Sequence, residues 1–143
     1  MKKRAARRIP RNFCYMCGGD NPQGMRLKFT IDDQQAVVLG TFNIAHRYQG
    51  PPSYVHGGII AAIVDEAMGK LNRPDGIRSM TAEMTVEYLH PVPLGRKIVV
   101  EARRVRHSGR NYWRECTIRD ALGKLLVRGQ GRFVKVGDRE AIR

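Results

Sequence analysis

The stretch YVHGGIIAAIVDEAMGKL, residues 54–71, combines two features that ordinary helices avoid. Two adjacent glycines, Gly57 and Gly58, stand where an apolar helical pattern begins, although glycine is a poor helix former. A carboxylate, Asp65, stands in the middle of the same pattern, where burial of an unpaired charge is costly. Both features therefore indicate a helix whose sequence has a purpose besides stability.

We predict this helix over residues 57–72, with two faces of different character. Side chains spaced by three and four residues form an apolar stripe that should pack against a sheet. They are Ile60, Ile63, Val64, Ala67 and Leu71. Small side chains form a second stripe, along which another backbone can come close. They are Gly58, Ala61, Ala62, Asp65 and Gly69. Glu66 and Lys70 have the i,i+4 spacing of a solvent-facing ion pair, and Pro74 should end the helix.

Outside the helix the apolar pattern has period two, which is typical of strands. The predicted strands cover about residues 25–32, 36–44, 80–88, 96–106, 111–120 and 124–136. Gly40 in the second strand is typical of a bulge. In the third, Met80 and every second residue to Tyr88 should share one face, and Thr81 should share the other with Glu83. Short turns join the later strands, so we expect antiparallel pairing and an α+β fold: a sheet of five to six strands and one buried helix.

Composition predicts one domain over residues 13–143, preceded by a basic flexible tail over residues 1–12. No apolar run is long enough to cross a membrane, and the first residues contain no apolar signal-peptide core. We therefore expect a cytoplasmic protein. Three cysteines do not indicate a disulfide framework.

Cys14 and Cys17 have the spacing of a zinc knuckle. A structural zinc site needs four ligands. The one remaining cysteine, Cys116, lies in a predicted strand, and no paired histidine motif follows. We therefore expect no metal at this motif.

The formal net charge of +13 allows two interpretations, a polyanionic partner or a basic soluble surface. Few aromatic residues accompany the arginines, which argues against a nucleic-acid surface that stacks bases. The best candidate for binding phosphate is RVRHSGRN, residues 104–111, where Arg106 and Arg110 accompany the backbone N–H groups of Ser108 and Gly109. An ordinary basic hairpin turn would have the same sequence.

The spacing within the helix limits what Asp65 can reach. Gly58 and Asp65 are seven residues apart, which is about 10 Å along a helix axis. The helix N-terminus presents free N–H groups that can polarise a carbonyl oxygen. Asp65 cannot reach a carbon held at its own helix start, but it can reach one held by a second, antiparallel helix. A two-fold dimer would contain two such sites.

Four segments resemble, in the same order, the hotdog-fold acyl-CoA thioesterases of the phenylacetate-pathway type. VHGGIIAAIVDEAMG, residues 55–69, resembles their signature, and CYMCGGDNPQGMRLKF, residues 14–29, resembles the opening of a bacterial and mitochondrial branch. MTAEMTVEYLHPVPLG, residues 80–95, and HSGRNYW, residues 107–113, resemble the segments that follow.

The resemblance implies a hotdog fold, a homodimer with one continuous sheet that is often paired into a homotetramer, and hydrolysis of an acyl-CoA substrate. It implies no metal or redox cofactor. By motif matching, the Gly58 N–H next to Gly57 would hold the thioester oxygen, and Asp65 of the other subunit would act as base or nucleophile. Thr81 would help to orient the water, and His56 would shape the loop and bond the thioester region.

Other interpretations remain open at this stage. Asp65 alone is also compatible with a polar interface residue, and His56 with a structural hydrogen-bonding residue. A hotdog-fold dehydratase or hydratase would pair a helix terminus with an acidic residue too. A non-catalytic protein that binds coenzyme A or nucleic acid would use the basic surface. The sequence does not choose the acyl group, dimer or tetramer, or base or nucleophile.

Overall fold

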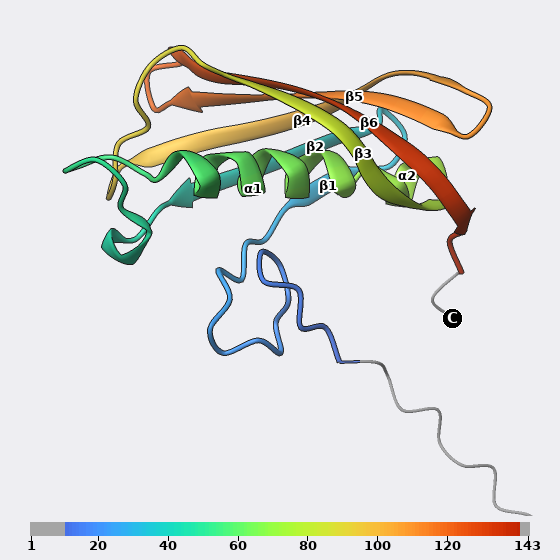
Figure 1. The fold of residues 1–143 in the computed structure, drawn as a ribbon, viewed down its shortest axis with the longest axis horizontal. Coiled ribbons are helices and arrows are strands. Elements are labelled where there is room, and N and C mark those ends of the chain that lie inside the picture. Colours follow the sequence, from blue (N-terminus) through green and yellow to red (C-terminus); the bar gives the residue numbers. More distant parts are fainter. Residues whose placement is uncertain (1–10, 141–143) are drawn as a thin grey trace, which may run out of the picture.

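A computed structural model describes residues 11–140 as a six-stranded antiparallel sheet with one long helix against it (Figure 1). The elements are β1 Thr30–Asp32, β2 Val37–Asn43, a 3-10 turn His46–Tyr48, α1 Gly57–Gly69, α2 Asn72–Asp75, β3 Ile77–Tyr88, β4 Lys97–Ser108, β5 Asn111–Asp120 and β6 Leu125–Asp138. The spatial order is β1-β2-β4-β5-β6-β3. The predicted order of elements and the α+β class are confirmed. Most of the predicted tail, residues 1–10, lies outside the described residues.

The helix ends earlier than the sequence predicts, and Pro74 is not what ends it. α1 stops at Gly69, and Pro74 lies inside the short helix α2. Proline is tolerated there because N–H groups in a first turn have no intrahelical acceptor. Gly76, with a left-handed φ of 67°, ends α2 instead.

The first two strands also differ in detail from their prediction. β1 is three residues long, because the preceding residues pair with the N-terminal segment: Met25 N–H donates to Tyr15 O and Leu27 N–H to Met16 O. Gly40 forms no bulge, since β2 and β4 pair without a register shift. A Cβ at Gly40 would lie 2.4 Å from the ring of Phe42, so the glycine instead makes room for a side chain.

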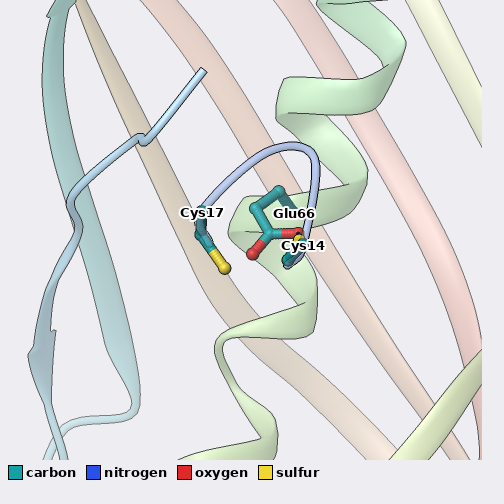
Figure 2. Close-up of side chains that lie close together, drawn as sticks. All are labelled: Cys14, Cys17 and Glu66. Atoms are coloured by element: carbon teal, nitrogen blue, oxygen red, sulfur yellow. The ribbon is translucent and has the colours of Figure 1, made fainter. Parts of the chain in front are cut away.

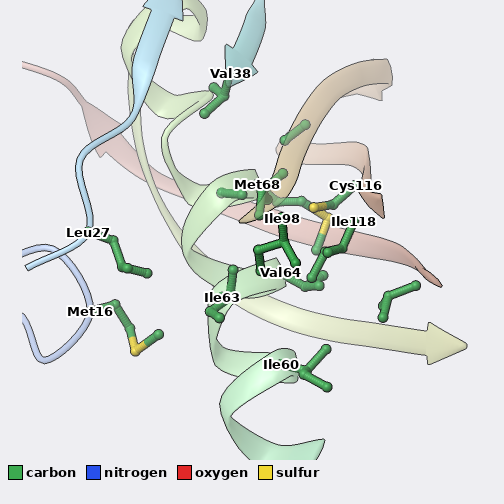
Figure 3. Packing of buried hydrophobic residues seen from close by; sticks show 14 of the residues in the cluster. Met16, Leu27, Val38, Ile60, Ile63, Val64, Met68, Ile98, Cys116 and Ile118 are labelled. Carbon is green, nitrogen blue, oxygen red and sulfur yellow. The ribbon is translucent and has the colours of Figure 1, made fainter. Parts of the chain in front are cut away.

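The core lies between α1 and the sheet, and the N-terminal segment closes it from another side (Figure 3). Ile63, Val64, Ala67, Met68 and Leu71 are fully buried. The helix approaches β6 closely because glycines face it. A Cβ on Gly129 would lie 2.3 Å from Cγ1 of Val64, and one on Gly131 would lie 3.0 Å from Cε of Met68.

Replacing Gly129 by alanine should therefore destabilise the protein by about 1–3 kcal/mol, because the added methyl overpacks the contact between helix and sheet. Urea denaturation measures the change. Gly19→Ala is the matched control, since a Cβ at Gly19 meets nothing within 4 Å. If Gly129→Ala were as stable as the parent protein, the close approach would not be a constraint.

A buried arginine joins the end of the helix to the sheet. Arg114 on β5 is 1% exposed, and its Nη1 donates to Met68 O at 3.0 Å and to Asn72 Oδ1 at 2.9 Å. Its Nη2 donates to Asp75 Oδ2 at 2.7 Å, and Arg104 pairs with the other oxygen of that carboxylate. Burial lowers the pKa of Arg114, and Asp75 opposes that shift, so the guanidinium keeps its charge. The network thus ties the last turn of α1 to the sheet.

No helix among residues 11–140 is long and apolar enough to cross a membrane.

Candidate functional site

The N-terminus of α1 is capped rather than bare. His56 is the N-cap residue, and its Nδ1 accepts a hydrogen bond from Gly58 N–H at 2.9 Å. A Cβ on Gly58 would lie only 3.1 Å from that nitrogen. The glycine therefore leaves room for the imidazole over the helix end. Because His56 is exposed, its ring can move away and release the Gly58 N–H to another acceptor.

Tyr88, which sequence reasoning did not assign to the site, joins the end of β3 to this helix start. Its hydroxyl donates to Gly57 O at 2.8 Å. Beside it lies an apolar pocket of about 460 Å³, lined among others by Tyr54, Ile60 and Leu89. From the sequence, Tyr88 could have been noticed only as an aromatic residue at the end of a predicted strand.

Asp65 and Thr81 meet directly. Thr81 Oγ1 donates to Asp65 Oδ1 at 2.7 Å, so the carboxylate of α1 faces β3. The predicted alternation along β3 is wrong here, since Thr81 does not share the face of Glu83. The register with β6 shifts between Thr81 and Glu83, which leaves Ala82 as the extra residue of a β-bulge.

The bulge turns Thr81 toward the helix. Thr81 lies opposite Phe133, whose side chain is buried, whereas Glu83 lies opposite Arg132 on the outer face. Met80, which precedes the inward-facing Thr81, is 65% exposed and does not share the face of Met84 as predicted. A hydroxyl that a regular strand would place on the outer face of the sheet is thereby brought to the carboxylate.

Gly58 and Asp65 do not meet within one chain. They lie two helical turns apart on α1, about 10 Å along its axis. The small-residue face of the helix, which carries both, remains partly exposed in the single chain. The neighbouring β3 is an edge strand, and among residues 11–140 no strand pairs with its outer side. The Asp65–Thr81 pair is therefore next to an open surface.

The basic hairpin between β4 and β5 lies apart from that pair. Arg106 stacks on Trp113, with its guanidinium carbon 3.6 Å from the ring centroid. In the register of the sheet, Arg106 lies opposite Trp113, Trp113 opposite Arg132, and Arg132 opposite Glu83. Side chains that lie opposite each other share a face, so this group lies on the face of the sheet opposite α1. The structure does not bring Arg106 together with Asp65.

The tip of the hairpin consists of the other predicted phosphate-binding residues. Ser108 pairs with Asn111 across the turn, Gly109 has a φ of 56°, and Arg110 Nε donates to Lys135 O at 3.1 Å. All three predicted residues are exposed. The turn therefore presents backbone and guanidinium donors to solvent, which suits an anion.

Residues 53–127 match the sequence profile of the family described as the thioesterase superfamily. The chain belongs to this superfamily. Rat acyl-coenzyme A thioesterase THEM4 is 36% identical over 89 residues, which are 62% of this chain and 38% of that protein. The Bos taurus THEM4 is 30% identical over 106 residues, 73% of this chain and 43% of that protein. The chain thus spans less than half the length of these curated relatives.

Solved structures of the superfamily confirm the hotdog fold. A thioesterase superfamily protein has a TM-score of 0.80 and 30% identity, covering 87% of this chain and 63% of that one. A hypothetical thioesterase protein from Streptococcus pneumoniae, with coenzyme A, has a TM-score of 0.73 and 16% identity, covering 79% of this chain and 92% of that one. The Escherichia coli PaaI protein from the phenylacetic acid degradation operon has a TM-score of 0.68 and 15% identity, covering 73% and 76%. At these lower identities the likeness concerns the fold alone.

Proposed function

We propose that the protein hydrolyses acyl-CoA thioesters at a composite site shared by two subunits. The observation that carries the proposal is the hydrogen bond between Thr81 and Asp65, made at the edge of an open, small-residue helix face. Membership of the thioesterase superfamily and the name of the THEM4 relatives support the reaction class.

A second copy of the chain would complete this site. β3 is a twelve-residue strand whose outer edge pairs with no strand in the described part of the chain, and proteins normally cover such an edge. Two copies that pair along β3 form one continuous sheet and bring their helices antiparallel. The small side chains of α1 permit the close approach, which places Asp65 near Gly58 of the partner subunit. Two such dimers can pair into a tetramer.

In the proposed reaction the thioester oxygen accepts the Gly58 N–H of one subunit after His56 has moved aside. Asp65 of the other subunit takes a proton from water, whose oxygen attacks the thioester carbon and generates an oxyanion held by the N–H. Collapse of this intermediate breaks the C–S bond and releases the thiolate of coenzyme A. The thiolate takes the proton from Asp65, which restores the carboxylate. Nucleophilic attack by Asp65 itself would use the same residues.

Binding of the substrate would use both ends of the site. We assign the acyl group to the apolar pocket beside Gly57 and Tyr88. The phosphates of coenzyme A would meet the Arg110 side chain and the N–H groups near Ser108 and Gly109, with Arg106 adding positive charge. The chemistry of this scheme uses no metal or redox cofactor.

A screen of aromatic, short and long acyl-CoA esters tests the function. Release of free thiol, followed with a thiol-reactive dye, is the expected result for at least one class. Formation of an enoyl-CoA without thiol release would favour the dehydratase alternative. Binding of coenzyme A with neither product would leave a binding protein, and steep salt-dependent binding of RNA or DNA would favour a nucleic-acid partner.

Thr81→Val should lower kcat on the best substrate about 10- to 100-fold, since a hydrogen bond to a charged group contributes roughly 1.5–3 kcal/mol. Thr81→Ser, which keeps a hydroxyl, should recover most of the rate. Thr85→Val is the control, because Thr85 lies on the outer face of the same strand, opposite Gln130. Equal rates for Thr81→Val and the parent protein would remove Thr81 from the site.

A further inference from the structure

Two cysteines of the N-terminal segment and one carboxylate of α1 form a cluster that includes no residue of the proposed site. Figure 2 shows Cys14 and Cys17 on one turn of chain, with the Glu66 side chain reaching toward them from the helix. One ligand atom from each residue lies within 4.8 Å of the other two. We propose that Cys14, Cys17 and Glu66 bind a thiophilic divalent cation, with Zn²⁺ as the best match.

The donor set matches the preferences of zinc. Thiolate sulfur and carboxylate oxygen are both common zinc ligands, and soft sulfur selects against Mg²⁺ and Ca²⁺. Three protein ligands leave a fourth tetrahedral position for water or another small ligand. The sequence-based expectation of no metal considered only cysteine and histidine. Glu66 follows Cys17 by 49 positions in the chain, and only the fold brings them together.

The turn that carries the cysteines is fixed by its own backbone. Gly18 N–H donates to Cys14 O at 2.8 Å, and Cys14 N–H donates to Asn12 Oδ1 at 3.1 Å. A Cβ on Gly18 would lie 2.4 Å from Cys14 N, so only glycine fits this tight path. Met16, between the cysteines, is buried in the core. The sulfurs are thus held near Glu66 without a cation, which lowers the entropy cost of binding one.

Lys70 now occupies part of the place that a cation would take. Its Nζ lies 3.2 Å from Glu66 Oε1, and the two side chains are 28% and 18% exposed. The predicted ion pair is present, but the N-terminal segment covers it, so it does not face open solvent. The ammonium already supplies positive charge to the carboxylate, and its flexible stem allows it to turn outward when a cation arrives.

A cation that binds this cluster competes with a thiol proton. Cys14 Sγ donates to Glu66 Oε2 at 3.7 Å. Burial, reinforced by the Glu66 carboxylate, raises the pKa of Cys17 to about 11. A cation must therefore displace thiol protons when it binds. The occupied cluster would tie the N-terminal segment to the middle of α1.

Titration of the reduced, chelator-treated full chain with Co²⁺ tests the proposal. We expect one equivalent to bind, with the near-ultraviolet absorption of cobalt–thiolate bonds, and Zn²⁺ to displace it. Glu66→Gln should weaken binding at least about tenfold, and Cys14→Ser with Cys17→Ser should abolish the band. Lys70→Ala should tighten binding, because it removes the competing ammonium. Cys116→Ala, which changes a cysteine outside the cluster, and Asp65→Asn should bind as the parent chain does.

Three results would overturn the proposal: no absorption band in the parent chain, a band that survives loss of both cysteines, or unchanged affinity in both Glu66→Gln and Lys70→Ala. Mass spectrometry of the air-exposed chain tests the remaining interpretation, in which the two cysteines form a disulfide. A Cys14–Cys17 disulfide, together with no Co²⁺ binding by the reduced form, would assign the pair to redox chemistry instead. Because Asp65→Asn is expected to keep the metal, the outcome is independent of the proposed thioesterase activity.

Discussion

Asp65→Asn is expected to lower kcat/KM on a good acyl-CoA substrate by roughly 10²- to 10⁴-fold, while the chain keeps its fold and its oligomeric state. The amide retains the size of the carboxylate and can still bond Thr81, but it cannot take a proton from water. Thiol release measures the rate, and size-exclusion chromatography measures assembly. Glu87→Gln is the matched control, because Glu87 is an exposed carboxylate on the neighbouring strand β3.

A near-normal rate in Asp65→Asn would contradict the proposed chemistry, and a mixing experiment tests the shared site separately. Gly58→Leu should also be inactive, because a side chain there covers the amide that would hold the thioester oxygen. Random mixing of the two inactive chains makes half of the dimers mixed, and each mixed dimer contains one intact site of two. About a quarter of the parent activity should return. No recovery, with mixed dimers present, would contradict a site built from Gly58 of one subunit and Asp65 of the other.

Arg114→Ala should have the largest effect on stability, a loss of about 3–5 kcal/mol in the free energy of unfolding. The substitution leaves Asp75, whose side chain is 3% exposed, without its buried partner and opens a cavity beneath the ring of Phe133. Urea denaturation measures the loss. Arg128→Ala is the control, since Arg128 is exposed on β6.

If Arg114→Ala does not fold, two further variants keep the prediction testable. Arg114→Lys retains the charge but cannot reach Met68 O, Asn72 and Asp75 at once, so it should be destabilised by less. Asp75→Asn in the Arg114→Ala background should recover part of the loss, because it removes a buried carboxylate whose remaining partner, Arg104, is partly exposed. A double variant no more stable than Arg114→Ala alone would show that the pair is not the cause.

Local patterns predicted the elements because their period is local. The apolar stripe of α1 and the alternation of β4, β5 and β6 each depend on near neighbours, and their bounds are confirmed within a few residues. The Asp65 position on the helix required no tertiary information. The same holds for the hairpin turns, where glycine and asparagine mark the change of direction.

Features that depend on pairing between distant segments were missed. The bulge at Ala82 arises from the register between β3 and β6, which no single strand encodes. The His56 side chain on Gly58 N–H is a rotamer choice, so the expectation of a bare helix end was wrong. Glu66 was assigned to solvent because the spacing within one helix says nothing of a segment that folds over it.

The bulge also determines which changes in the gene the proposed site could survive. Ala82 contributes strand length rather than a functional group, so exchanging it for another small residue should matter little. Deleting it would remove the bulge but keep the site, because Thr81 and Glu83 would become neighbours that point to opposite faces and stay opposite Phe133 and Arg132. A homologue that lacks one residue here would therefore show a gap inside the strand in an alignment and still present its hydroxyl to the carboxylate.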